Sequence, residues 1–194
     1  IDTVYADETQ TTTKTFAANQ LTKAFAGGAD GTSCESGEEG WNVVLKHDDA
    51  EHKYPQAVWN LSESFDLANV ESVTFNVKSQ EGVIALKLGM TNASGWYDDV
   101  EACYGQNGQK QYTIVPEKTE GTFDKVVIMT TQNDASFCLT SVVVTLKEMN
   151  GVNRIDDFVK MCLARGWLVQ RLDIENQLDL YCLLYTSPSP RDTR

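Results

Sequence analysis

Two histidines and three acidic residues stand together in the segment HDDAEH at residues 47–52. Imidazoles and carboxylates are common metal ligands and common acid–base groups. However, a five-residue offset between His47 and His52 puts the two rings on the same side of neither a helix nor a strand. We therefore interpret the segment as a solvated loop that joins two strands.

Other patterns that carry chemistry are absent from the sequence. The chain has two histidines in all, no GxSxG nucleophile elbow and no GxGxxG or Walker loop, and the glycines at 27–31 are expected to form a turn. Outside the C-terminal tail, Cys34, Cys103, Cys138 and Cys162 fit no zinc spacing. We expect buried free thiols, and a bridge between Cys103 and Cys138, both in predicted strands, stays open.

The sequence also lacks the DxDxDG calcium loop, for which the pair Asp98-Asp99 is too short. We therefore expect no catalytic residues, no metal site identifiable from sequence and no cofactor. A structural calcium ion is left open, with no ligands selected. The chain itself is predicted not to be an enzyme, and the activity of a longer parent protein, a glycoside hydrolase among the options, is left open.

The aromatic residues offer a different kind of chemistry. Trp96 and Tyr97 lie in SGWYDD, between turn residues and acids, where exposed rings could pack on the apolar C–H face of a sugar. The alternative is that Trp96 folds back over the end of the domain. Strand alternation puts Gln56 and Asn60 opposite Trp59, which we expect in the core, so their amides are candidates for binding sugar hydroxyls.

The charge balance excludes some partners. Sixteen Lys and Arg against 28 Asp and Glu give a net charge of −12. Such a surface repels phosphate backbones and anionic lipid, so we expect neither nucleic-acid nor membrane binding. No apolar run approaches the roughly 20 residues that cross a bilayer. A polysaccharide or oligosaccharide is the expected partner, and we expect the protein to be a monomer.

The elements that would position these residues are strands. Apolar residues alternate with polar ones in two neighbouring segments, and the set expected to face inward is Val73, Phe75, Val77, Ile84, Leu86 and Leu88. The turn Glu81-Gly82 between the segments predicts that they pair as a hairpin. Further strands are predicted at Trp41–Lys46, Gln56–Leu61, Val100–Tyr104, Gln111–Val115, Lys125–Thr130 and Phe137–Lys147.

Many short strands with one apolar face must bury that face against a second sheet. We therefore predict an all-β fold, an antiparallel β-sandwich of the jelly-roll type, over residues 15–149. After it, Ile155, Phe158, Val159 and Cys162 have helical spacing. A short helix rarely folds alone, so residues 150–181 are expected to begin a truncated second module.

The two ends of the chain are treated separately. Residues 1–14 are polar, and Val4-Tyr5-Ala6 has the small last residue of a signal-peptidase site, so we expect an export remnant there. Residues 182–194 begin with CLLYTSPSPRD, which resembles a translated sequencing adapter. We interpret residues 182–194 as an artefact and exclude them from the fold.

Within residues 54–146, several core motifs look familiar. They are LSESFDL at 61–67, VTFNV at 73–77, ALKL at 85–88, VIM at 127–129 and SVVVTL at 141–146. These motifs resemble the jelly-roll carbohydrate-binding modules attached to secreted polysaccharide hydrolases, xylanases among them, of gut clostridia. The resemblance covers about half the chain and consists mainly of core positions.

The resemblance implies a secreted, non-catalytic module that tethers a hydrolase to a plant cell-wall glycan such as xylan or β-glucan. It also agrees with an export remnant at the N-terminus. The alternative function is a β-sandwich spacer or adhesion module of a bacterial surface protein, without glycan specificity.

Overall fold

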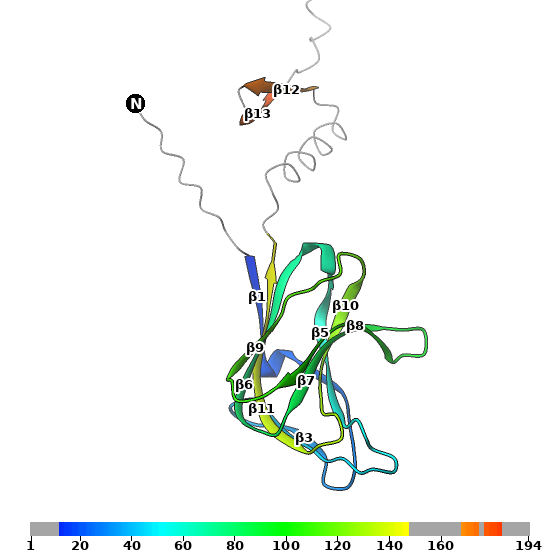
Figure 1. Cartoon of the computed structure of the whole chain (residues 1–194). Coiled ribbons are helices and arrows are strands. Elements are labelled where there is room, and N and C mark those ends of the chain that lie inside the picture. Colours follow the sequence, from blue (N-terminus) through cyan, green and yellow to red (C-terminus); the bar gives the residue numbers. More distant parts are fainter. Residues whose placement is uncertain (1–11, 148–167, 175–176, 184–194) are drawn as a thin grey trace, which may run out of the picture. The chain divides into compact units, whose positions relative to one another are not determined.

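The structure is a computed structural model that describes residues 12–147, 168–174 and 177–183 (Figure 1). The chain divides into two compact units, residues 1–148 and residues 149–194. Each unit is described by itself. In the described part of the chain, no helix is both long enough and apolar enough to cross a membrane.

The first unit consists of two antiparallel sheets, which Figure 1 shows as two layers. The first sheet has the order β3-β4-β11-β6-β9, and β1 pairs with the second half of β11. Its strands are β1 (Thr12–Ala17), β3 (Ser33–Ser36), β4 (Trp41–Leu45), β6 (Val70–Glu81), β9 (Gln111–Ile114) and β11 (Ala135–Leu146).

The second sheet has the order β2-β5-β10-β7-β8. Its strands are β2 (Thr22–Gly27), β5 (Gln56–Asp66), β7 (Ile84–Thr91), β8 (Tyr97–Gln106) and β10 (Thr122–Met129). Two single turns of 3-10 helix, η1 (Ala18–Gln20) and η2 (Leu67–Asn69), follow β1 and β5. The predicted antiparallel β-sandwich is thus confirmed. The structure adds β1, β2 and β3, which the sequence analysis did not predict.

The core lies between the two sheets because each sheet is apolar on its inner face. All six residues predicted to face inward from the alternation are buried there. Trp59 is fully buried beside them, as predicted, and its ring lies 6.3 Å from that of Trp41. Alternation with period two therefore identified the inner face of the strands correctly.

The predicted hairpin between residues 73–77 and 84–88 is wrong. β6 pairs with β11 and β9 in the first sheet, whereas β7 pairs with β10 and β8 in the second. The turn at Glu81-Gly82 therefore carries the chain from one sheet to the other. Gly82 has φ +81° and lies against the Asp134 carbonyl, where a side chain would not fit. Alternation specifies the buried face of a strand but not the strand with which it pairs. A hairpin within one sheet and a connection between two sheets therefore have the same sequence pattern.

The second unit contains β12 (Leu168–Ile174) and β13 (Gln177–Leu183), which pair as an antiparallel two-stranded sheet. Cys182 and Leu183, assigned to the adapter-like tail, pair with Val169 and Leu168 in this sheet. The helix predicted from Ile155 lies outside the described residues, as do the N-terminal residues 1–11 and the tail beyond residue 183.

Candidate functional site

The outer face of the second sheet carries a compact apolar cluster. Val58 on β5 and Val127 on β10 are paired neighbours, and both side chains point away from the core because they alternate with Trp59 and Val126. Both valines are fully buried, although they lie on the outside of the sandwich. The ring of Tyr97 covers them, and it is 8% exposed.

Tyr97 reaches these valines from the edge strand β8 by crossing β7 at Gly89. A Cβ atom at Gly89 would lie 2.7 Å from Tyr97 Cδ2, so the missing side chain leaves the space in which the ring packs. At the far end, the Tyr97 hydroxyl donates a hydrogen bond to Gln56 Oε1 on β5. Burial, and secondarily the negative charge of Asp99, raise the pKa of the Tyr97 phenol to about 12, so the phenol keeps its proton at neutral pH.

Trp96 lies against Tyr97 on the same face. Its ring is 5.0 Å from the Tyr97 ring and 4.9 Å from the Phe25 ring of β2, with which it makes an edge-to-face pair. Trp96 and Phe25 remain 38% and 39% exposed. The loop before Trp96 is ordered by Asn92, whose Oδ1 accepts hydrogen bonds from the backbone N–H groups of Ser94 and Trp96.

A groove of about 460 Å³ lies beside this cluster. The residues that line the groove are Tyr54, Gln56, Lys87, Tyr97, Tyr104, Met129 and Thr131. Tyr54 and Tyr104 are 55% and 61% exposed. The buried Tyr97 lies in the groove between polar groups from β5 and β7.

Charged and amide groups on this face are already ordered by one another. Lys87 Nζ forms an ion pair of 2.6 Å with Asp99, and only 13% of the Lys87 side chain is exposed. Lys125 Nζ donates to Asn60 Oδ1 at 2.6 Å and to Thr91 Oγ1 at 2.8 Å. Asn60 is therefore engaged in the sheet and is not among the residues that line the groove.

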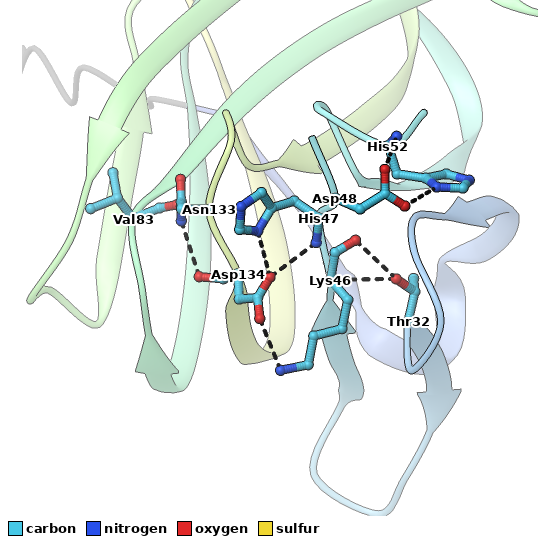
Figure 2. A network of polar contacts seen from close by, with 8 residues as sticks. All are labelled: Thr32, Lys46, His47, Asp48, His52, Val83, Asn133 and Asp134. Carbon is cyan, nitrogen blue, oxygen red and sulfur yellow. Dashed lines mark hydrogen bonds and ion pairs between the residues drawn. The ribbon is translucent and has the colours of Figure 1, made fainter. Parts of the chain in front are cut away.

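The segment HDDAEH lies in the loop between β4 and β5, and the carboxylate of Asp48 holds this segment in shape (Figure 2). Asp48 Oδ1 accepts the backbone N–H groups of Ala50, Glu51 and His52, and its Oδ2 is 2.7 Å from His52 Nδ1. The N–H of Glu51, then the His52 ring, hold the pKa of the Asp48 carboxyl well below its usual range.

The start of the same loop is fastened to the turn between β10 and β11. Asp134 Oδ1 accepts the backbone N–H of His47 at 2.9 Å and lies 2.7 Å from His47 Nδ1, while Lys46 pairs with Asp134 Oδ2 (Figure 2). The N–H of His47, followed by its ring, lowers the pKa of the Asp134 carboxyl. The two histidines of this loop thus contact different acids, His47 the carboxylate of Asp134 and His52 that of Asp48.

Within the described residues, no three His, Cys, Asp or Glu side chains come together as a metal site. In the same part of the chain, Cys34, Cys103 and Cys138 are free. Burial raises the pKa of the Cys34 thiol to about 11 and also raises that of Cys138, so neither is an activated nucleophile.

Three of the four residues singled out from the sequence come together here: Tyr97 and Gln56 line the groove, and Trp96 contacts Tyr97. The expectation that the Tyr97 ring is exposed is wrong, because the gap above Gly89 lets the ring pack on the sheet. Tyr54 and Tyr104 also line the groove but were not predicted from the sequence. Tyr54 sits in a Tyr-Pro turn and Tyr104 ends a predicted strand, and neither pattern distinguishes a groove wall from any other exposed tyrosine.

The chain is similar to solved structures of carbohydrate-binding modules. No family model and no curated protein matches the sequence. Among solved structures, a low-affinity xylan-binding module, CBM86, from the xylanolytic gut symbiont Roseburia intestinalis is 31% identical, with a TM-score of 0.54; the match covers 70% of this chain and 96% of that module. A family 29 carbohydrate-binding module is 14% identical over 70% of this chain and 93% of its own, with a TM-score of 0.49.

The fold is that of a carbohydrate-binding module. At 31% identity over nearly the whole of the Roseburia module, the chain belongs to its family, CBM86.

Proposed function

We propose that residues 12–147 are a non-catalytic module that binds a neutral plant cell-wall polysaccharide of the xylan class in the groove. The observation that carries the proposal is the composition of the groove walls. Two exposed tyrosines, Tyr54 in the loop before β5 and Tyr104 on β8, lie beside an amide and an ammonium group, those of Gln56 and Lys87. The match to a xylan-binding module supports xylan as the polymer.

The chemistry of the groove suits a sugar chain. Ring faces of Tyr54 and Tyr104 offer apolar area to the C–H face of a sugar, with a gain of roughly 25 cal/mol per Å² removed from water. Gln56 offers both a donor and an acceptor, and Lys87 adds N–H donors, which match the two roles of a sugar hydroxyl. Because only a few rings take part, the expected affinity is modest, and retention on a polymer comes from repeated binding.

We further propose that the module serves a secreted hydrolase that acts on the same polysaccharide. The family membership and the small residue at the end of Val4-Tyr5-Ala6 support this setting. Sequencing the gene that encodes this module tests the proposal: a signal peptide and a glycosidase domain in the same reading frame are expected, whereas repeated sandwiches with a wall anchor would favour the spacer function.

Affinity electrophoresis in soluble xylan, β-glucan and mannan gels tests the binding function. The wild-type protein is expected to be retarded in xylan. Tyr104→Ala and Trp96→Ala should each weaken retention roughly 10-fold or more, which corresponds to about 1.4 kcal/mol. Val115→Ala is the matched control, because Val115 is 66% exposed and is not among the residues that line the groove. Wild-type protein that runs unretarded in all three gels would reject the proposal.

A further inference from the structure

A network of polar side chains surrounds the end of β7, in the sheet that carries the groove. Lys125 on β10 is a buried cation, only 8% exposed. Its ammonium group donates to Asn60 Oδ1 of β5 at 2.6 Å and to Thr91 Oγ1 of β7 at 2.8 Å. Hydrogen bonds from a charged donor are stronger than those between neutral groups. The ammonium group therefore ties a side chain of β5 to the last residue of β7.

Asp124 on β10 binds the same threonine from a second direction. Its Oδ2 accepts the Thr91 hydroxyl, and its Oδ1 accepts the Thr91 backbone N–H at 3.0 Å. The backbone pairing between β10 and β7 ends at Lys125 and Gly89, although β7 continues to Thr91. The Asp124 carboxylate therefore replaces the missing strand partner at the end of β7.

An irregularity in β10 allows these two neighbouring side chains to converge. Adjacent residues of a regular strand point to opposite faces of the sheet. However, the register of β10 with β5 shifts between Phe123 and Lys125, and an irregularity of this kind re-aims a side chain. As a result, Asp124 and Lys125 both contact the Thr91 hydroxyl, which donates to the carboxylate and accepts from the ammonium group.

Thr91 directly precedes the turn that presents Trp96. The N–H of Asn92 donates to the Trp96 carbonyl at 2.9 Å, and Asn92 Oδ1 accepts the N–H of Trp96 at 3.1 Å. Thr91 itself pairs with Tyr97 at the other end of the turn. Because these contacts join both residues after the turn to Thr91 and its neighbour, a shift of Thr91 would also shift Trp96.

We propose that Lys125, Asp124 and Thr91 are positioning residues for Trp96, which fix the end of β7 and thereby hold the Trp96 ring in place beside the groove. The inference rests on the proposed function, in which Trp96 contributes to retention on xylan. A ring that is held in advance loses little binding energy in being ordered when a sugar packs on it. Asn60 then acts as an acceptor for Lys125 and not as a ligand for a sugar hydroxyl.

Affinity electrophoresis in xylan gels tests the proposal with variants of Thr91. Thr91→Val keeps the shape of the side chain but removes the hydroxyl, and it should weaken retention roughly 3-fold or more. Thr91→Ser keeps the hydroxyl and should be retained like wild-type protein. Thr113→Val is the matched control, because it removes a hydroxyl that bonds Thr74 in the other sheet, and it should leave retention unchanged.

A double-mutant cycle shows whether the effect passes through the Trp96 ring. In the Trp96→Ala background, Thr91→Val should cause no further loss of retention, and Lys125→Met should behave in the same way as Thr91→Val. An equal loss in both backgrounds would overturn the proposal, because Thr91 would then act on the sugar or on the whole sheet. Wild-type retention of Thr91→Val would overturn it as well.

Fluorine NMR of protein labelled with 5-fluorotryptophan separates this proposal from the proposed function, because it requires no sugar. The Trp96 resonance is identified by its absence from Trp96→Phe. Thr91→Val and Lys125→Met should shift this resonance and leave the other tryptophan resonances unchanged, whereas Thr91→Ser and Thr113→Val should shift none. If these shifts occur but wild-type protein does not bind xylan, the proposed function alone fails. An unchanged Trp96 resonance in both variants, or shifts of every tryptophan resonance, would overturn the positioning role even where xylan binds.

Discussion

The contact between Gly89 and Tyr97 makes a sharp prediction about how the groove is built. In Gly89→Ala, the new Cβ atom would lie 2.7 Å from Tyr97 Cδ2 and 3.1 Å from Cγ. Ordinary carbon contacts are about 3.5–4.0 Å, so the ring must move by about 1 Å. Overpacking of this kind costs about 1–3 kcal/mol of the free energy of unfolding. The displaced ring also loses its place over Val58 and Val127 and its hydrogen bond to Gln56.

A double-mutant cycle separates this clash from any other effect of the substitution. Urea unfolding is measured for wild-type protein, Gly89→Ala, Tyr97→Ala and the double variant. With the ring removed, Gly89→Ala should become neutral or slightly stabilising, because alanine restricts the unfolded chain more than glycine does. Gly89→Ala should also weaken retention in xylan gels. An equal cost of Gly89→Ala in both backgrounds would refute the reasoning, since the cost could then not come from Tyr97.

Two further predictions concern the core and the loop. Phe75→Ala should lower the free energy of unfolding by about 3–5 kcal/mol, because it empties a fully buried site between the sheets. The control Thr74→Ala, on the outer face of the same strand, should lower it by about 1 kcal/mol or less. Equal losses for the two variants in urea unfolding would contradict the prediction. The pKa of the Asp48 carboxyl is lowered in the folded state. Its contribution to the stability of the fold is therefore complete above the unfolded pKa of about 3.9 and is lost as pH falls further. Asp48→Asn should therefore make the acid limb of the stability profile shallower below about pH 4, and superimposable acid limbs would count against the role assigned to Asp48.

Local sequence determined which side of each strand is buried. Period-two alternation is a property of the strand itself, so Phe75 and Trp59 could be assigned to the core, and Gln56 to the outer face, without knowledge of the topology. The turn residues also marked several loops, although β5 runs to Asp66, past its predicted end at Leu61. Because many strands with one apolar face must bury that face against a second sheet, the sequence also predicted a two-layer β-sandwich.

Tertiary structure decided which strands are neighbours and therefore which side chains come together at the groove. Pairing depends on contacts between residues far apart in the chain, so local alternation did not reveal that β6 and β7 belong to different sheets. The burial of Tyr97 likewise depends on Gly89 of the adjacent strand, and the groove exists because Tyr54 and Tyr104, 50 positions apart in the sequence, are brought to one face. Residue types and periodicity carry no information about such convergence, because it is set by the packing of the whole sheet.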